Sequence, residues 1–353
     1  MNATTVGVDL AKNRFELAIR VGEDQPLRRE RLSRQRFARF FSNFPPSLIV
    51  MEACGSAHFW ARTLQAQGHE VRLLPAQYVR AYVRRNKTDA ADAAALLEAA
   101  RSPDLRPVPV KTVEQQQLQH LHRVREQLKS TRTGRINLLR GILREFGIAV
   151  PVGLARGRTA VREALEIADN GLPDLLRPMI AETLQEITAL SERIARIEAT
   201  LTALTRTDPV VQCLLELPGV GLLGASALRA AVGDILRFPT GRHFASWLGL
   251  TAREHSSAET RRLGRISKQG DTYLRTLLVH GARSALCAAA RAHSQGRPLD
   301  RLRLWALATE QRRGRNKATV ALANKLARII WATWRYQRPF AGDWPARLEA
   351  TPG

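Results

Sequence analysis

The sequence predicts an α/β domain at the N-terminus, followed by two parts that are all helical. In the first third of the chain, apolar runs with β-branched centres alternate with helical patterns. Leucines and isoleucines then recur with heptad spacing, and long helical patterns fill the last third. The 353 residues are enough for two or three domains. We therefore divide the chain into residues 1–110, 111–207, 208–340 and a tail, 341–353.

The first domain begins with two strand patterns. Residues 4–10 (TTVGVDL) and 14–21 (RFELAIRV) are separated by three residues, which predicts a hairpin. The run SLIVMEA predicts a buried strand that ends at Glu52, and helix and strand patterns alternate after it to about Ala100. This alternation is typical of a mixed sheet with right-handed crossovers.

The middle part is dominated by helical patterns. One extends from Val113 to about Phe146, and a Gly/Pro-containing loop at 147–158 follows it. Beyond this loop, apolar residues recur in steps of three and four: Ile180, Leu184, Ile187, Leu190, Ile194, Ile197, Leu201 and Leu204. The spacing predicts a coiled coil of about three heptads. A helical hairpin within one chain and a seam between two chains fit this pattern equally well.

The last part is helical and strongly basic. Two helices flank the turn LPGVG, and Asp271 is placed to cap a long basic helix after an open loop at 251–270. Residues 251–338 contain 19 Lys/Arg and 5 Asp/Glu, which is more than half of the chain's net charge of +23. This concentration predicts a C-terminal surface that binds a polyanion such as nucleic acid.

Several classes of protein lack support in the sequence. Cys54, Cys213 and Cys287 are far apart and lack zinc-site spacing, so we expect neither disulfides nor a structural zinc. The N-terminus has no basic segment before an apolar run, and 18 uninterrupted apolar residues occur nowhere. We therefore expect a cytoplasmic protein without a membrane partner.

Four carboxylates stand out in the first domain. Asp9 and Glu52 end predicted strands, and Asp89 and Asp92 lie three residues apart on a predicted helix. Strand ends and a helix face can converge at one edge of a sheet. Taken singly, the helical pair is explained by the helix dipole and Asp9 by a turn. The combination of hard oxygen ligands predicts a Mg²⁺ site.

The turn LPGVG resembles a helix-hairpin-helix motif. In such a motif Gly219 and Gly221 would let backbone N–H groups approach a phosphate at a helix N-terminus. A tight turn between helices, with no ligand, is the alternative.

The loop REHSSAETRRLGRISK combines two serines with basic residues. Its phosphate contacts are expected from Arg261, Arg262, Arg265 and Lys268. Neither Ser256 nor Ser257 lies in a Gly-x-Ser-x-Gly elbow, so an α/β-hydrolase is disfavoured. From the residues alone, each serine is a turn or phosphate contact.

Five motifs, in order, carry a resemblance to a known family: VGVDLAKNRFELAI, MEACGSAHFWARTL, KTDAADAAALL, LPGVGLLGASALRAAVGDILRFPTGRHFASWLGL and HSSAETRRLGRISKQGDTYLRTLLVHGARSAL. From about residue 4 to 335 the chain resembles the IS110 family of insertion-sequence transposases, which includes the Piv-type invertases. The resemblance implies a RuvC-like (RNase H-like) N-terminal domain, a coiled-coil segment and a C-terminal domain with a nucleophilic serine.

The resemblance also implies roles for particular residues. Asp9, Glu52, Asp89 and Asp92 would be the family's D-E-D-D metal ligands. The serine before the family's glycine corresponds best to Ser257, but Ala258 replaces that glycine, so Ser256 remains an alternative. The implied partners are donor and target DNA, an RNA that bridges them, and further copies of the chain in a dimer or tetramer.

This chemistry is physically reasonable. A serine oxygen that attacks a phosphodiester conserves the bond energy as a phosphoserine, which a DNA 3′-hydroxyl can later resolve. Mg²⁺ on the carboxylates would stabilise charge on the phosphate, and Arg261, Arg262 and Arg265 would hold adjacent phosphates. The sequence therefore predicts a recombinase that exchanges DNA strands through a serine–DNA intermediate.

Three other functions fit parts of the sequence. A RuvC-like structure-specific nuclease would use metal-activated water and leave Ser257 as a phosphate contact. A sugar-kinase or actin-like ATPase also has an early aspartate, but the turn after Asp9 reads Leu-Ala-Lys and lacks the glycine expected beside a nucleotide phosphate. A scaffold that binds nucleic acid without catalysis would need none of the carboxylates.

Overall fold

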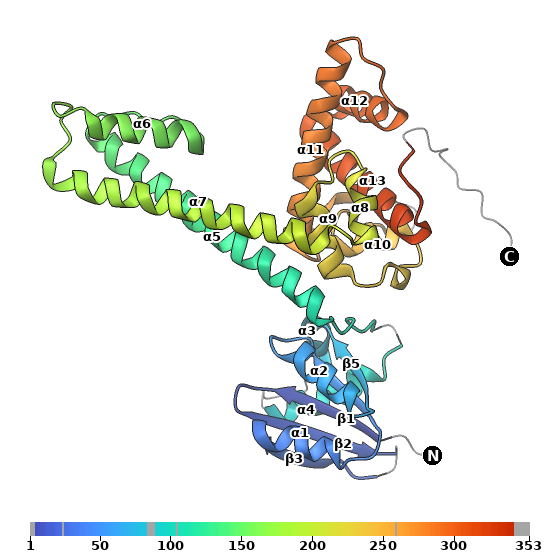
Figure 1. The fold of residues 1–353 in the computed structure, drawn as a ribbon. Helices are drawn as coiled ribbons and strands as arrows, with labels where there is room; N and C mark the ends of the chain where they lie inside the picture. The colour runs from blue at the N-terminus through green and yellow to red at the C-terminus, as the bar shows by residue number, and fades with distance from the viewer. Residues whose placement is uncertain (1–3, 23–24, 83–88, 104, 258–259, 342–353) are drawn as a thin grey trace. The chain divides into compact units, whose positions relative to one another are not determined.

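The computed structural model describes residues 4–22, 25–82, 89–103, 105–257 and 260–341, and only the backbone of Asp89 and Ala90 (Figure 1). The chain folds into two compact units, Met1–Val113 and Glu114–Gly353. The predicted tail, 341–353, lies outside the described residues except for its first residue. None of the described helices is both long enough and apolar enough to cross a membrane.

A mixed sheet forms the centre of the first unit. The order of its strands, within the described residues, is β3-β2-β1-β4-β5. β1, β2 and β3 pair antiparallel, whereas β1, β4 and β5 pair parallel. The bounds are β1 Thr4–Leu10, β2 Arg14–Val21, β3 Arg28–Ser33, β4 Leu48–Glu52 and β5 Glu70–Leu74. The predicted hairpin and the predicted strand ending at Glu52 are confirmed.

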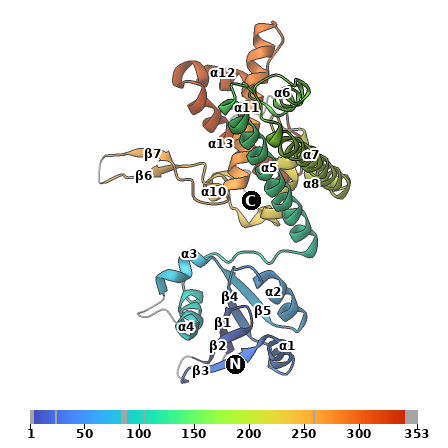
Figure 2. The ribbon, with the colours of Figure 1, turned by 90° about the vertical axis from the view of Figure 1, so that its left-hand side faces the viewer.

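Helices cover both faces of this sheet. α1 (Arg34–Ser42) and α2 (Ala57–Ala66) pack on one face, where Phe15 contacts Phe37 and Trp60 edge to face. α4 (Asp89–Ala100) packs on the other face, as Figure 2 shows. Between β5 and α4 lie a short helix, α3 (Ala76–Val79), and the 3₁₀ turn η1 (Arg80–Tyr82). The predicted α/β domain is therefore a sheet between two helical layers.

The second unit begins with a helical hairpin. α5 (Val113–Glu145) and α7 (Arg177–Thr205) are antiparallel: Arg125 Nε lies 2.7 Å from Glu198 Oε1, and Arg135 Nε lies 2.6 Å from Glu186 Oε2. The residues that occupy one heptad position, seven residues apart, are buried: Ile180, Ile187, Ile194 and Leu201. Ile180 and Ile187 pack with Leu139 and other residues of α5, and Leu201 packs with Leu118 of α5. Of the two arrangements that the heptads allowed, the structure contains the internal hairpin.

The helix between these two begins earlier than expected. α6 (Leu154–Glu166) starts inside the segment 147–158 that was predicted to be a loop. The turn before it is made by Gly153, whose φ of +108° is a conformation that favours glycine. Val161 and Ala164 then bury one face of α6 against the α5–α7 hairpin.

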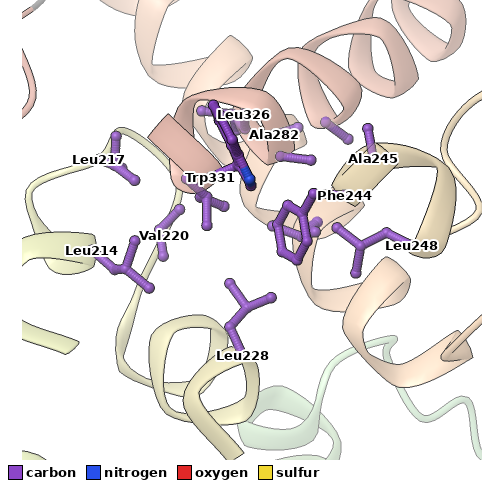
Figure 3. Packing of buried hydrophobic residues seen from close by; sticks show 14 of the residues in the cluster. Leu214, Leu217, Val220, Leu228, Phe244, Ala245, Leu248, Ala282, Leu326 and Trp331 are labelled. Carbon is purple, nitrogen blue, oxygen red and sulfur yellow. The ribbon is translucent and has the colours of Figure 1, made fainter. Parts of the chain in front are cut away.

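The rest of the second unit is a helical bundle with one small hairpin. Its helices are α8 Pro209–Leu215, α9 Leu222–Val232, α10 Gly241–Trp247, α11 Thr272–Ser294, α12 Arg301–Arg313 and α13 Arg315–Tyr336, with a 3₁₀ turn η3 at Ile235–Arg237. Figure 3 shows part of their shared core, in which Leu228, Phe244 and Trp331 are buried. Asp271 caps α11 as predicted, because its Oδ1 accepts a hydrogen bond from Leu274 N at 3.0 Å.

A buried polar network joins the helical hairpin to this bundle. His122 of α5 is only 3% exposed, and its ring nitrogens lie 2.9 Å from Tyr273 Oη and 3.0 Å from Ser226 Oγ. Burial, and secondarily the charge of Arg125, lowers the pKa of His122 to about 4. Burial also raises the pKa of Tyr273 to about 12. The neutral imidazole therefore links α5 to α9 and α11.

This network predicts a pH dependence of stability. The unfolded chain binds a proton on His122 near pH 6.5 and the folded chain only near pH 4, so stability is full above pH 6.5 and falls toward pH 4. The loss is at most about 3 kcal/mol. The free energy of unfolding is measured in urea at several pH values between 7 and 4.5. His122→Gln should make this free energy depend less on pH, whereas substitution of the exposed His255 by glutamine should not. Parallel curves for His122→Gln and wild type would contradict the prediction.

Candidate active site

The two strand-end carboxylates lie side by side on the sheet. Val8 of β1 and Met51 of β4 are partners in parallel register, so Asp9 and Glu52 are the next residues along neighbouring strands. Side chains alternate along a strand, so Asp9 shares the face of Gly7 and Glu52 shares the face of Val50. Gly7 and Val50 both lie on the face of the sheet that α4 covers, so Asp9 and Glu52 lie on that face too.

α4 brings a third carboxylate toward the same face. The helix lies so close to β1 that a Cβ on Gly7 would collide with the backbone oxygen of Ala93. Asp92, which is half-buried, immediately precedes this contact. Asp89 lies one turn earlier on α4, and its side chain is outside the described residues. Sheet register and the close approach at Gly7 therefore place Asp9, Glu52 and the segment of α4 that contains Asp92 on one side of the sheet.

The carboxylates that the structure describes do not form a complete set of metal ligands by themselves. Among the side chains that the structure describes, no three of the His, Cys, Asp and Glu type lie close enough together to hold a metal ion. Asp9, Glu52 and Asp92 are nevertheless hard oxygen donors, which are the ligands that Mg²⁺ takes, and it commonly retains several waters. The donor chemistry fits a divalent cation that is held by few protein ligands.

The serine loop folds into a β-hairpin that the sequence patterns did not predict. β6 (Ala252–Glu254) pairs antiparallel with β7 (Leu263–Ile266). Toward the tip, Ser257 and Thr260 exchange backbone hydrogen bonds of 3.2 Å and 2.9 Å. Ala258, which stands in place of the expected glycine, lies outside the described residues. The hairpin presents both serines to solvent next to its tip.

The two serines differ in their hydrogen bonds. Ser256 Oγ donates to Glu254 Oε1 at 2.7 Å and accepts from Arg262 N at 3.2 Å, so it is part of the hairpin's own structure. Within the described chain, the hydroxyl of Ser257 has no hydrogen-bond partner. A hydroxyl that the fold does not use remains available to a ligand.

The predicted phosphate contacts lie on this hairpin and are exposed. They are Arg261, Arg262, Arg265 and Lys268. Arg261 Nε lies 3.4 Å from Glu254 Oε1, an ion pair that contributes little in full solvent. These cations are therefore accessible to an anion that approaches the serines.

Two glycines hold the base of the hairpin. Gly249 and Gly270 have φ angles of +71° and +99°, and a Cβ on either would collide with the backbone oxygen of Gln269 or Trp247, respectively. The strands are joined there by hydrogen bonds from Ser267 N to Thr251 O and from Lys268 N to Gly249 O. The backbone at the base is therefore tightly packed, although the sequence patterns indicated only an open loop.

This packing predicts a strong effect of one methyl group. Gly270→Ala should lower the free energy of unfolding by at least about 2 kcal/mol, because alanine disfavours the positive φ and its Cβ would meet Trp247 O. The matched control is Gly264→Ala in β7, where the nearest atom to a new Cβ is 3.6 Å away. The control should change urea unfolding by no more than about 0.5 kcal/mol. Equal effects of the two substitutions would contradict the prediction.

The LPGVG turn is used for close packing between helices. Gly219 has a φ of +84°, and a Cβ on it or on Gly281 of α11 would collide with the backbone of the other residue. This contact explains Gly219 by the tight-turn alternative. Gly221 precedes α9 in open space and lines a cavity of about 680 Å³ with His280 and Ser284. The phosphate contacts at Gly219 and Gly221 remain predictions.

Comparisons with known proteins match two regions of the chain. Residues 6–148 match the model of the DEDD transposases of IS110, described as "Transposase". Residues 211–297 match the model described as "Transposase IS116/IS110/IS902 family". The first match includes all four predicted ligands, and the second includes the β6–β7 hairpin.

Full-length relatives carry corresponding names. A "Probable family 20 transposase" of Pseudomonas aeruginosa is 45% identical over 94% of this chain and 97% of its own length. The "Transposase for insertion sequence element IS1111A" of Coxiella burnetii is 37% identical over 95% of this chain and 90% of its own. The "Transposase for insertion sequence element IS1328" of Yersinia enterocolitica is 37% identical over 94% and 96%. The chain therefore belongs to the IS116/IS110/IS902 family of insertion-sequence transposases, and it is a DNA transposase.

Proposed function

We propose that this transposase exchanges DNA strands through a covalent bond between Ser257 and a DNA phosphate. The observation that supports the assignment is the difference between the two serines: Ser256 is hydrogen-bonded within the hairpin, whereas Ser257 Oγ has no hydrogen-bond partner among the residues that the structure describes. In the proposed step, Ser257 Oγ bonds to phosphorus and the bond from phosphorus to the 3′ oxygen breaks. The serine proton goes to solvent, and the leaving oxygen becomes a 3′-hydroxyl. A second 3′-hydroxyl then displaces the serine in the reverse chemistry.

The hairpin's cations would hold the DNA during these steps. Arg261 and Arg262 lie just before β7, Arg265 is in β7, and Lys268 follows it. A guanidinium can bind a phosphate through two parallel hydrogen bonds, which positions the phosphorus as well as neutralising its charge. These residues are phosphate contacts under either the serine mechanism or simple binding.

We further propose a RuvC-like first unit that binds Mg²⁺ through Asp9, Glu52, Asp89 and Asp92. The mixed sheet with order β3-β2-β1-β4-β5, and the shared face of Asp9 and Glu52, support this proposal. Mg²⁺ bound there would stabilise charge on the phosphate oxygens and lower the pKa of the attacking hydroxyl. The proposed site prefers Mg²⁺ to other hard divalent cations.

The catalytic site is proposed to be composite. Ser257 and the four carboxylates belong to different units of the fold, so one reaction centre must combine parts of both. The combination can come from two copies in a dimer or tetramer. The resemblance to the family adds an RNA that bridges donor and target DNA, for which the net charge of +23 supplies ample electrostatic attraction.

The experiment that tests this function is a search for protein-linked DNA. The full chain is incubated with Mg²⁺, an end-labelled duplex spanning the element's junction, and the transcript of the noncoding segment beside the gene. Denaturing gels and peptide mass spectrometry should show DNA attached to the peptide that contains Ser257. Free nicked ends without protein-linked DNA would instead favour the RuvC-like nuclease, with water as the nucleophile.

A further inference from the structure

α13 has an unusual distribution of charge. Its 22 residues include five cations and no acidic residue. Most of the helix is buried in the bundle core, but Lys325 is half-buried at the border and Arg328, one turn later, is exposed. The cationic side of α13 is therefore narrow, and it borders the surface of the bundle.

A third cation comes from α10. The start of α10 is pressed against α13: a Cβ on Gly241 would lie 3.1 Å from Arg328 Cα and 3.2 Å from its carbonyl oxygen. Arg242 follows directly and is exposed. We refer to Arg242, Lys325 and Arg328 as the α10–α13 cation cluster.

The cations of this cluster act on one another. Burial, and then the charge of Arg242, lowers the pKa of Arg328, and burial followed by the charge of Arg328 lowers the pKa of Lys325. In the part of the chain that the structure describes, none of the three has an acidic partner at salt-bridge distance. Neighbouring like charges without a countercharge raise the free energy of the protein, and a bound anion would relieve this repulsion.

Lys325 is held in position by an aromatic ring. Its Nζ lies 4.1 Å from the centre of the Trp305 ring, which belongs to α12. A cation over the face of tryptophan is stabilised by the ring's quadrupole, so the side chain is oriented before any ligand arrives. The cluster's cations come from α10 and α13, and α12 supplies the ring that orients one of them.

The cluster is attached to the base of the serine hairpin. Asn324, the residue before Lys325, donates a hydrogen bond of 3.0 Å from Nδ2 to the backbone oxygen of Leu250. β6 begins two residues later, at Ala252. The segment of α13 that carries the cluster therefore contacts the chain just before the hairpin that carries the predicted phosphate contacts.

We propose that Arg242, Lys325 and Arg328 bind backbone phosphates of duplex DNA that extends beyond the serine hairpin. The proposal rests on the proposed function for the direction from which DNA approaches. Duplex DNA is chosen because the chain belongs to a family that acts on DNA, and its backbone presents one negative charge per about 1.7 Å of helix axis. The cluster binds without reading sequence, because it contacts only the backbone.

The test measures DNA affinity as a function of salt. A fluorescent DNA duplex is titrated with the full chain by anisotropy over a series of NaCl concentrations, for wild type and the double variant Arg242→Gln, Arg328→Gln. Each lost phosphate contact should reduce the slope of log Kd against log salt by about 0.9, so the double variant should lose about 1.8. Its affinity near 0.1 M NaCl should fall by about tenfold or more.

The control is the double variant Arg193→Gln, Arg196→Gln, which removes two exposed cations from α7. It loses the same number of charges as the double variant of the cluster. The control should retain most of the slope, and Arg328→Lys should recover most of the affinity that Arg328→Gln loses. The cluster is not a DNA site if its double variant matches the α7 variant, or if only binding to an RNA duplex is weakened.

The outcome is separable from the serine mechanism. Absence of a Ser257-linked product would overturn the proposed function. A reduced salt slope in the double variant would still show that the cluster contacts phosphates. Conversely, an unchanged slope with normal adduct formation would overturn only the cluster. Equal urea unfolding curves for wild type and both double variants show that the comparison concerns folded protein.

Discussion

Ser257→Ala is expected to abolish the covalent protein–DNA adduct, whereas Ser256→Ala should retain it. The hydroxyl of Ser257 has no partner among the described residues, while that of Ser256 bridges Glu254 and the backbone N–H of Arg262. Loss of a nucleophile lowers turnover on the order of 10³-fold or more, because the remaining groups cannot replace the missing bond. The measurement is the yield of labelled DNA that migrates with the denatured protein.

Each serine variant has its own internal control. Ser257→Ala should bind DNA with the affinity and salt dependence of wild type, since it removes no cation and no side-chain hydrogen bond within the described part of the chain. Ser256→Ala should loosen the hairpin by about 1 kcal/mol, from the loss of two hydrogen bonds at an exposed site, and slow the reaction without ending it. The assignment is reversed if only Ser256→Ala loses the adduct.

Asp9→Asn and Asp92→Asn should each abolish strand exchange and leave DNA binding mostly intact. Both residues lie on the side of the sheet that α4 covers, together with Glu52. An amide is similar in size to a carboxylate but has no charge, so it binds a hard divalent cation much less well. Exchange is measured by the joining of labelled donor and target duplexes, and binding by anisotropy in the same buffer.

Two controls separate a metal role from a structural role. Glu70→Gln removes a carboxylate from the beginning of β5, where it is exposed and pairs with Arg72 at 2.8 Å, and it should leave exchange nearly unchanged. EDTA should suppress exchange by the wild type, and added Mg²⁺ should restore it. Equal exchange in EDTA and in Mg²⁺ would show that the carboxylates are structural. Unchanged recombination in both Asp variants would favour a nucleic-acid scaffold.

The strands that the sequence failed to predict are those at exposed edges. β3 contributes one buried side chain, Leu32, to a run of charged residues, and β6 is exposed at every position. Strand prediction relies on alternation between a buried and a solvated face, and these segments have almost no buried face. β1 and β2, whose centres are buried, were predicted with the bounds that the structure has.

Longer helices were predictable because each buries a repeating apolar face. The helical patterns around Val113, Ile180 and Asp271 correspond to α5, α7 and α11. Their partners were not predictable in the same way. Heptad spacing specifies a seam but not the helix that fills it, and the ion pairs from Arg125 and Arg135 show that α5 of the same chain lies against α7.

The sequence by itself determined the chemical inventory: four carboxylates, two adjacent serines, a basic C-terminal part, and ordered motifs that indicate the family. These properties depend on residue identity and order, which a linear chain displays directly. Only the tertiary structure decided which groups face one another. Parallel register sets Asp9 beside Glu52, a hairpin hydrogen bond distinguishes Ser256 from Ser257, and contact at Gly241 brings Arg242 to Arg328. The paired residues are far apart in sequence, and the two adjacent serines differ only in the partners of their side chains. Packing and hydrogen bonding in the folded chain therefore determine these contacts.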